Sequence, residues 1–352
     1  MTMKPIFKCE LNYFESPHLS QLYSGFEILK KRGIVEISVK AVSNDSKKPV
    51  LQVRLNDQYT LIYDTLDGLN WIDGDRRENL NYFKNNIRAD FYFKRSFNQQ
   101  IIDYAPDNCR VFPLGLNYPI SPRHLYRRNV KESFKNVLRN NYFISKYLKI
   151  NRANIHSENF EFYPAANKMN NILFLARLWD PADVQQDHLK SEREAINNYR
   201  VSCMKSCLKE FKQHFTGGLQ MDAFSLKYCR ELVMPFSLTK RDVYLDTVKQ
   251  SNICIATTGL HDSIGFKMGE YVAASRAIVS EPLLYILPGR FENRRNYFSF
   301  LNEEELLSNI YFLFKNKDAL METMQNNYRY YHHYVRPDIL VLNTLLTVSS
   351  AS

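Results

Sequence analysis

Three short apolar stretches in the second half of the chain constrain its fold most. Residues 172–176 (ILFLA) are apolar without a break, residues 253–256 (ICIA) repeat this pattern, and residues 277–281 (AIVSE) resemble it. A continuous apolar run of this length is typical of a strand buried on both faces, as in a parallel sheet. Stretches typical of helices lie between and around these strands, at about 187–213, 240–250 and 265–275. The alternation predicts right-handed crossovers and a parallel sheet.

The other expected elements follow from similar patterns. A helix is expected over residues 16–33, where Ser16 can cap it, Pro17 is tolerated in the first turn and Gly33 ends it. A later helix is expected to begin after a capping Asn302. Further strands are expected at 6–11, 35–42, 50–55, 59–64, 89–97, 110–116 and about 214–219, and a further helix at about 130–148.

At 352 residues the chain has room for about two domains. We expect an α/β fold in which two Rossmann-like domains, residues 1–160 and residues 161–325, face a cleft. The polar segment 151–170 marks the boundary, and residues 326–352 are expected to form a C-terminal helix that packs back towards the first domain. In open α/β sheets ligands bind at the carboxyl ends of the strands, which places the expected site in the cleft.

Composition excludes several classes of protein. Hydrophobic residues make up 45% of the chain and aromatic residues 14%, which rules out a disordered protein. The apolar runs are far shorter than the roughly 20 residues that span a bilayer, and the N-terminus has no apolar core of a signal peptide. The six cysteines are scattered and are expected to be buried thiols in a reducing cytoplasm. The net charge of +10 suits an anionic partner.

One stretch at the predicted sheet edge raises a functional question. Residues 257–265 lie between an expected strand and an expected helix, so the free N–H groups of that helix face the edge and favour an anion such as phosphate. Gly265 allows a ligand to approach the backbone closely, and Glu270 could accept hydrogen bonds from sugar hydroxyls. The alternative is an ordinary helix cap formed by Asp262 or Ser263.

Residues 262–282 (DSIGFKMGEYVAASRAIVSEP) resemble the donor-site signature of GT-B glycosyltransferases of the family-4 type. Asp262 occupies the first acidic position, and Gly265 and Glu270 fall in register. Arg177 resembles the Arg that follows the first strand of the donor domain in that family. The resemblance covers about residues 171–315, and the same stretch is somewhat similar to exostosin-type inverting transferases. The N-terminal half matches the family only in its organisation.

The resemblance implies transfer of a sugar from a nucleotide-diphosphate sugar to a glycan, a lipid-linked acceptor or a protein-linked glycan acceptor. No metal and no cofactor are expected, and the acidic pairs in DTLD (64–67) and DGD (73–75) are interpreted as turns and caps. The implied donor-binding residues are Arg177, Lys267, Asp262, Ser263, Gly265 and Glu270.

The chain departs from the family pattern at three positions. Ala182 stands where a Lys is usual, Lys267 replaces a Pro, and Asp262 replaces a Glu. Other cations are then expected to hold the donor phosphates, and Lys267, Lys190 and Arg193 are the candidates.

A catalytic base is expected in the first domain if the reaction inverts the sugar configuration. Asp64 ends the expected strand 59–64 and is therefore placed at the cleft edge, while Glu15 and His18 follow the first strand at a comparable edge. The alternative is that Asp64 caps a turn and that Glu15 or His18 only begins a helix.

Two competing functions stay open at this stage. One is a sugar-nucleotide epimerase or phosphorylase of the same architecture. The other is a basic nucleic-acid-binding protein in which the aromatic residues of 326–337 stack on bases, although no nucleic-acid partner is expected because no recognised module is present. The basic surface also suits peripheral contact with an anionic membrane.

Overall fold

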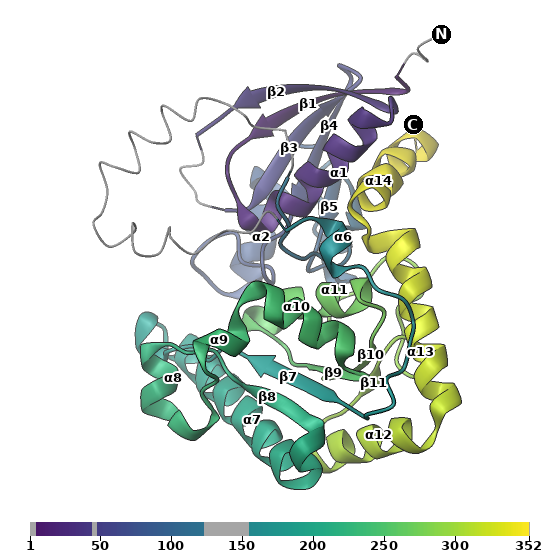
Figure 1. Ribbon diagram of the computed structural model, residues 1–352. Helices are drawn as coiled ribbons and strands as arrows, with labels where there is room; N and C mark the ends of the chain where they lie inside the picture. The colour runs from purple at the N-terminus through teal and green to yellow at the C-terminus, as the bar shows by residue number, and fades with distance from the viewer. Residues whose placement is uncertain (1–4, 44–47, 123–154, 352) are drawn as a thin grey trace, which may run out of the picture.

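The computed structural model describes residues 5–43, 48–122 and 155–351, which form two α/β domains (Figure 1). Each domain has one sheet, so the predicted fold class of two α/β domains facing a cleft is confirmed. The helix expected at about 130–148 lies outside the described residues.

The first sheet has six strands in the order β2-β1-β3-β4-β5-β6 and is mixed rather than parallel. Strand β3 runs antiparallel to both of its neighbours, β1 and β4. The cause is the turn between β3 and β4, in which Asn56 and Asp57 adopt φ of 53° and 59°. Two left-handed residues form a tight hairpin, and hairpin strands are antiparallel. The strands are β1 (Phe7–Tyr13), β2 (Val35–Ala41), β3 (Val50–Leu55), β4 (Tyr59–Asp64), β5 (Phe91–Lys94) and β6 (Arg110–Pro113).

In the described part of the first domain, the helices before residue 123 are α1 (Ser20–Lys31), α2 (Arg76–Asn86) and the single turn α3 (Gln100–Asp103). A short 3-10 turn precedes α1, and Ser16 stands before it without a capping hydrogen bond from its side chain. The predicted cap is therefore wrong, and the hydroxyl of Ser20 donates to the Pro17 carbonyl oxygen at 2.7 Å instead. Gly33 follows α1 with φ of 74°, which confirms the predicted helix end.

The second sheet is parallel throughout, with the order β11-β10-β9-β7-β8. Alternate residues of β7 point into two different apolar clusters, for example Leu173 into one and Phe174 into the other. Both faces of the sheet are thus buried, as predicted. Along the chain, β8 is added on one side of β7 and β9 on the other. The strands are β7 (Ile172–Ala176), β8 (Phe215–Leu219), β9 (Ile253–Ala256), β10 (Ala277–Ser280) and β11 (Phe298–Ser299).

The second-domain helices are α7 (Asp187–Phe211), α8 (Ala223–Tyr228), α9 (Phe236–Thr239), α10 (Arg241–Gln250), α11 (Phe266–Ala273) and α12 (Glu303–Lys315). Asn302 caps α12 as predicted, since its side chain accepts a hydrogen bond from the Glu305 backbone N–H at 2.9 Å. Helix α11 has Gly265 at its N-cap position and no capping hydrogen bond from a side chain. The alternative cap by Asp262 or Ser263 is therefore not formed.

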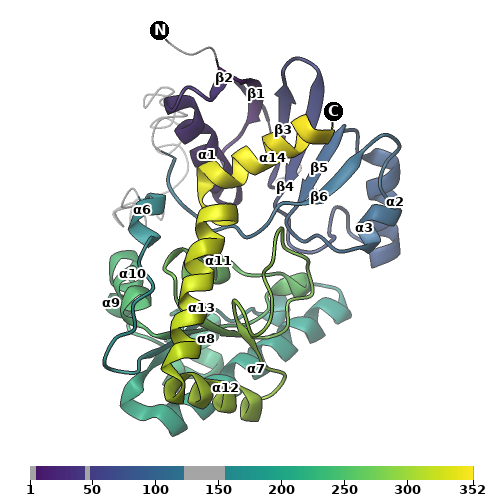
Figure 2. The ribbon, with the colours of Figure 1, turned by 90° about the vertical axis from the view of Figure 1, so that its right-hand side faces the viewer.

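The last part of the chain runs from the second domain to the first (Figure 2). It consists of α13 (Lys317–Tyr330), a π-helical turn (Tyr331–Val335) and α14 (Pro337–Ala351). Leu340, Val341 and Leu345 of α14 belong to the apolar core of the first domain. Helix α14 also approaches α1 closely, because a Cβ added to Gly25 would lie 2.2 Å from the Pro337 carbonyl oxygen.

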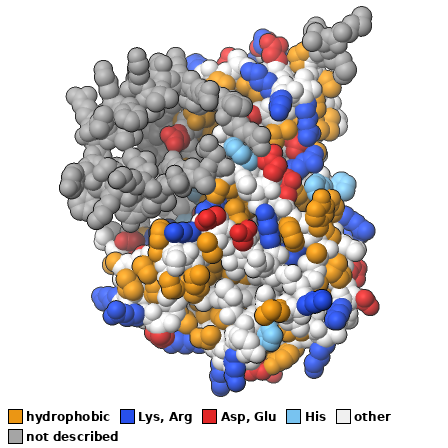
Figure 3. All heavy atoms as spheres, viewed as in Figure 1, with side chains coloured by type: hydrophobic (Ala, Val, Ile, Leu, Met, Phe, Trp, Pro, Cys, Tyr) orange, Lys and Arg blue, Asp and Glu red, His pale blue; other side chains and the backbone are white. Residues whose placement is uncertain are grey.

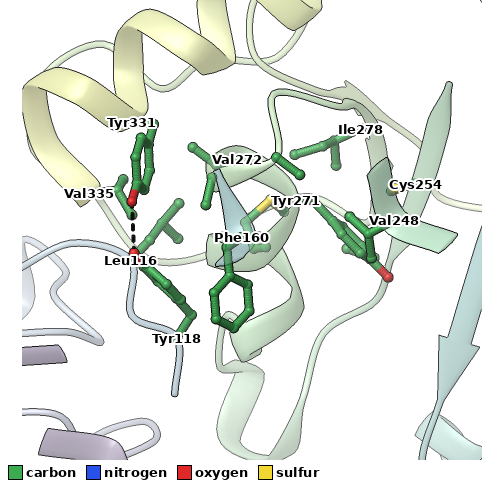
Figure 4. Packing of buried hydrophobic residues seen from close by; sticks show 14 of the residues in the cluster. Leu116, Tyr118, Phe160, Val248, Cys254, Tyr271, Val272, Ile278, Tyr331 and Val335 are labelled. Carbon is green, nitrogen blue, oxygen red and sulfur yellow. Dashed lines mark hydrogen bonds between the residues drawn. The ribbon is translucent and has the colours of Figure 1, made fainter. Parts of the chain in front are cut away.

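The two domains share an apolar cluster that also includes Tyr331 and Val335 of the π-helical turn before α14. Leu116 and Tyr118 follow the last strand of the first sheet and pack with second-domain residues such as Tyr271, as Figure 4 shows. The hydroxyls of Tyr118 and Tyr331 are 3.0 Å apart and hydrogen-bonded. The short helix α6 (Ser157–Phe160) adds Phe160 to the same cluster. Because these segments contact both domains, the predicted domain boundaries at residues 160 and 325 stay predictions.

Candidate active site

The carboxyl ends of the second sheet open onto the cleft between the domains. Strand order reverses between β7 and β9, and in doubly wound sheets ligands bind outside such a reversal. Two cavities of about 430 and 540 Å³ lie there. We call the first the α11 cavity, since residues 263–268 around the start of α11 line it. We call the second the α1 cavity, since residues 14–18, which precede α1, line it. His18, Asp67 and Leu260 line both, so the two cavities adjoin.

The N-terminus of α11 is open to the α11 cavity. Gly265 has φ of −68°, which any residue adopts, and no atom of the described chain would lie within 4 Å of a Cβ added to it. The absence of a side chain at Gly265 is therefore not required by the surrounding protein. It leaves the first N–H groups of α11 accessible from the cavity, which favours an anionic ligand.

The loop before α11 has an unusual backbone. His261 and Asp262 adopt φ of 57° and 58°, a conformation that side-chain-bearing residues rarely adopt in succession. The loop is held by the Glu192 carboxylate, which accepts from the His261 N–H at 2.6 Å, and by the Tyr285 hydroxyl, which donates to the His261 carbonyl oxygen at 2.9 Å. Ser263 is buried and lines the α11 cavity, whereas Asp262 is exposed and is not among the described residues that line either cavity.

Arg177 follows β7 and lines the α11 cavity, as predicted from its position after the first strand of this domain. Its side chain is exposed, and its guanidinium carbon lies 4.4 Å from the centre of the Trp179 ring. A surface ion pair with Asp180, which is the alternative role for Arg177, is not formed among the described residues, and an Asp180 carboxylate oxygen accepts from the Ala182 N–H at 2.9 Å instead. The Arg177 guanidinium is thus held against an aromatic face and is available to a ligand.

Arg200 was not predicted and organises the loops that follow β7 and β9. Its guanidinium donates to the Thr257 hydroxyl at 2.9 Å and to the carbonyl oxygens of Thr258 and Arg177 at 2.8 and 2.5 Å. Burial lowers the pKa of Arg200 to about 10, so it stays charged at neutral pH. It therefore fixes both loops and adds a positive charge to the α11 cavity.

Glu270 lines the α11 cavity, but both of its carboxylate oxygens already have protein partners. Arg241 donates to one oxygen at 2.7 Å, and the Tyr244 hydroxyl donates to the other. Burial acts to raise the pKa of Glu270, yet the nearby charges of Arg241 and Lys267 hold the pKa below its usual value. Glu270 is thus ionised and keeps Arg241 in place, while its predicted contact with ribose stays a prediction.

Lys267, the residue that replaces a Pro of the family pattern, lines the same cavity. Its ammonium lies 4.4 Å from the centre of the Tyr244 ring, and burial lowers its pKa. The other two candidate cations lie elsewhere. Lys190 pairs with Asp187 at 3.0 Å, and Arg193 donates to the Asp180 carbonyl oxygen at 2.6 Å.

Asp64, the first candidate for a catalytic base, lies inside the first domain rather than at the cleft edge. Its side chain is fully buried and accepts hydrogen bonds from Trp71 Nε1 at 2.8 Å, from the Tyr92 hydroxyl and from Lys94 Nζ at 3.1 Å. The loop after β4 folds back over Asp64, because Lys94 also donates to the Leu66 carbonyl oxygen. Asp64 therefore holds this loop in place, and a role as a base stays a prediction.

Glu15 and His18, the other two candidates, both line the α1 cavity. Glu15 is exposed, whereas His18 packs against Phe266 with the ring centres 4.8 Å apart. Burial, aided by the charge of Arg95, lowers the pKa of His18 to about 4. His18 is therefore neutral at pH 7, and its buried Nδ1 has no hydrogen-bond partner among the described residues. A neutral imidazole between two cavities can accept a proton from a ligand hydroxyl.

The acidic motifs have structural roles. Asp75 of the DGD sequence caps α2, accepting from the Glu78 N–H at 2.8 Å, and the Glu78 carboxylate accepts from the Asp75 N–H at 2.8 Å. This capping box confirms the interpretation of 73–75 as a cap. Over residues 5–43, 48–122 and 155–351 there is no group of three or more His, Cys, Asp or Glu side chains that could hold a metal ion.

The distribution of surface charge and the length of the helices test the expected nucleic-acid and membrane partners. On the face shown in Figure 3, Lys and Arg side chains are scattered over the second domain and intermixed with acidic ones. They do not form the continuous basic stripe typical of nucleic-acid-binding proteins. Within the described part of the chain, no helix is both long and apolar enough to cross a membrane.

No family model and no curated protein matches this chain. Among solved structures, it is similar to HepE from Anabaena in complex with UDP, with 12% identity, 99% of this chain and 100% of that chain covered, and a TM-score of 0.44. It is similar to the pneumococcal O-GlcNAc transferase GtfA in complex with UDP and GlcNAc (10% identity, 92% and 54% covered, TM-score 0.43). It is also similar to WaaG, a glycosyltransferase involved in lipopolysaccharide biosynthesis, with 10% identity, 95% of this chain and 96% of that chain covered, and a TM-score of 0.42. The function proposed below rests on the site itself.

Proposed function

We propose that this chain is a glycosyltransferase that moves a sugar from a nucleotide-diphosphate sugar to a glycan, lipid-linked or protein-linked acceptor without a metal ion. The observation that carries the proposal is the α11 cavity. It combines an open helix N-terminus at Gly265 with the cations Arg177, Arg241 and Lys267, and it lies at the reversal of strand order in a parallel sheet. This combination suits a diphosphate.

The chemistry of the transfer gives each cavity a role. When the bond between the sugar and the diphosphate breaks, negative charge grows on the leaving group, and preorganised N–H groups and cations stabilise that charge. The leaving group would lie in the α11 cavity. The acceptor would occupy the adjoining α1 cavity, where His18 can take the proton from the attacking hydroxyl if the reaction inverts the configuration. The net charge of +10 also suits an anionic lipid-linked acceptor at a membrane surface.

The first test is a thermal-shift screen of UDP, GDP and ADP and their sugar conjugates. We expect one nucleotide series to raise the melting temperature, since a ligand that binds only the folded state stabilises it in proportion to its occupancy. Products of a reaction with that sugar nucleotide and a panel of glycans are then analysed by NMR. A new glycosidic bond supports the proposal. Interconversion of free sugar nucleotides would show an epimerase instead, and binding of RNA without any nucleotide effect would overturn the proposal.

A further inference from the structure

One ion pair lies where the two cavities meet. Asp67 belongs to the loop after β4 and lines both cavities, and its carboxylate pairs with the guanidinium of Arg95, which follows β5. The two side chains differ in exposure. That of Arg95 is 5% exposed and that of Asp67 is 39% exposed. Asp67 can therefore move into the α1 cavity, whereas Arg95 is fixed in the boundary between the domains.

Arg95 belongs to the first domain but reaches the donor side of the cleft. Its Nη1 donates to the Asn117 side-chain oxygen at 2.9 Å and to the carbonyl oxygen of Ile264 at 3.1 Å. Ile264 directly precedes Gly265, so the guanidinium lies beside the open N-terminus of α11. Arg95 also lines the α11 cavity, and its buried Nε has no hydrogen-bond partner among the described residues. A buried guanidinium with an unused donor favours a further anionic partner.

We infer that Asp67 and the diphosphate of the donor compete for Arg95, so that donor binding releases the Asp67 carboxylate into the α1 cavity. The inference rests on the proposed function, because it needs a diphosphate at the start of α11. A diphosphate there carries more negative charge than one carboxylate and can use the free Nε as well. The released Asp67 then accepts a hydrogen bond from an acceptor hydroxyl, beside His18. Acceptor binding thereby depends on donor binding, which limits entry of acceptor into an empty enzyme.

The arrangement of the loop supports this exchange. The segment that carries Asp67 is held at its base, because the Gly68 N–H donates to the Ser96 hydroxyl at 2.9 Å and Leu66 is bonded to Asp64 and Lys94. It is held from the other domain as well, since the Asn70 amide nitrogen lies 3.2 Å from His261 Nε2. The Asp67 side chain can therefore change partner by rotation, without a movement of the backbone.

The test is the affinity of the full-length protein for the tightest binder among UDP, GDP and ADP, measured by calorimetry. Asp67→Asn removes the competing charge and should bind that nucleotide about fivefold or more tightly than the wild type, the scale of a partly exposed ion pair. Asp57→Asn is the control, because it removes one negative charge from the first domain whose partner is Lys8 rather than Arg95. We expect its affinity to stay within about twofold of the wild type.

A double-mutant cycle separates competition from a general charge effect. In an Arg95→Lys background, Asp67→Asn should tighten nucleotide binding much less, because an ammonium cannot reproduce the several fixed donors of the guanidinium. If the wild type binds a nucleotide and Asp67→Asn binds it no more tightly, the inference is overturned while the proposed function stands. If none of the three nucleotides binds to the wild type, the proposed function itself fails.

Discussion

The α11 cavity and the α1 cavity adjoin in one cleft, but they are built in different ways. Much of the α11 cavity is formed by residues that directly follow the strands β7 and β9, and its key positions Arg177 and Gly265 are fixed by those strands and by the start of α11. The α1 cavity is formed by side chains from segments far apart in the chain, such as His18, Asp67 and His261. The main residues of the α11 cavity can therefore be predicted from local sequence, whereas the α1 cavity can be recognised only from the tertiary structure.

The two domains also stabilise buried charge differently. In the second domain, the fully buried Arg276 donates to five backbone carbonyl oxygens, including those of Tyr163, Ala165 and Ser251. It thereby attaches the segment before β7 to the sheet. In the first domain, Lys94 is paired with Asp64, and neither side chain is exposed. Substitutions of Lys94 and Arg276 can therefore test whether these buried charges stabilise the fold, and substitutions at the cavities can test whether other charges bind a ligand.

The largest effect is expected for Lys94→Met. The substitution leaves the Asp64 carboxylate buried without its counter-ion, and breaking a buried pair in this way costs about 3–5 kcal/mol of unfolding free energy. Urea unfolding followed by circular dichroism measures it. The control is Lys8→Met, whose pair with Asp57 is exposed and whose loss should hardly change stability. Equal stability of Lys94→Met and the wild type would show that Asp64 is not charged in the folded protein.

A loss of similar size is expected for Arg276→Met. The apolar side chain fills part of the space but leaves several buried carbonyl oxygens without a donor, and each one that water does not reach costs about 1–3 kcal/mol. Unfolding in urea again provides the measurement, and the exposed Arg290→Met is the control. A variant as stable as the wild type would mean that water replaces the guanidinium at these oxygens.

Glu270→Gln tests whether Glu270 in the α11 cavity binds ribose or holds the neighbouring cations in place. We expect nucleoside diphosphate affinity to fall by about 1.5–2 kcal/mol, the value of a hydrogen bond to a charged group, because Arg241 loses its anionic partner. Inorganic pyrophosphate distinguishes two explanations. If Glu270 acts by holding Arg241 and Lys267, both ligands lose the same affinity in calorimetry. If Glu270 binds ribose, only the nucleoside diphosphate is affected.

Site residues could be predicted from the sequence where they directly follow a recognisable strand, but not where their partners lie far away in the chain. Arg177 and Gly265 follow apolar strands in the sequence, so their place at the sheet edge could be predicted. Arg200 could not, because nothing in the strongly charged helix α7 marks the one arginine that reaches back to Thr257 and Thr258, more than 50 residues later. Arg95 was missed for the same reason, since its partner Ile264 belongs to the other domain.

Two misplacements have local causes. Asp64 was placed at the cleft edge because it ends a strand, but the loop after β4 folds back over it, and strand patterning carries no information about such a loop. The antiparallel direction of β3 was not predicted because the Asn56–Asp57 turn lacks the glycine of the strongest hairpin signals, Asn-Gly and Asp-Gly.

A further prediction concerns the pH dependence of stability at His18. Burial lowers the pKa of His18 to about 4 from 6.5, so the unfolded chain binds more protons than the folded protein between these values. The contribution of His18 to stability is therefore fully present above about pH 6.5 and is lost as the pH falls towards 4. The unfolding free energy of His18→Asn should fall less over that range than that of the wild type. Parallel pH profiles would mean that His18 is solvated.

The most direct test of the cleft as a donor site is the affinity of Arg177→Ala for the nucleoside diphosphate found in the screen. Arg177 is exposed and bonded to no acidic residue among those the structure describes, so its removal should leave the melting temperature nearly unchanged. Calorimetry should show affinity for the nucleoside diphosphate and for its sugar conjugate reduced about tenfold or more, as expected when a charged hydrogen-bond pair to phosphate is lost. Unaltered affinity for both ligands in a folded variant would contradict the placement of the diphosphate in the α11 cavity.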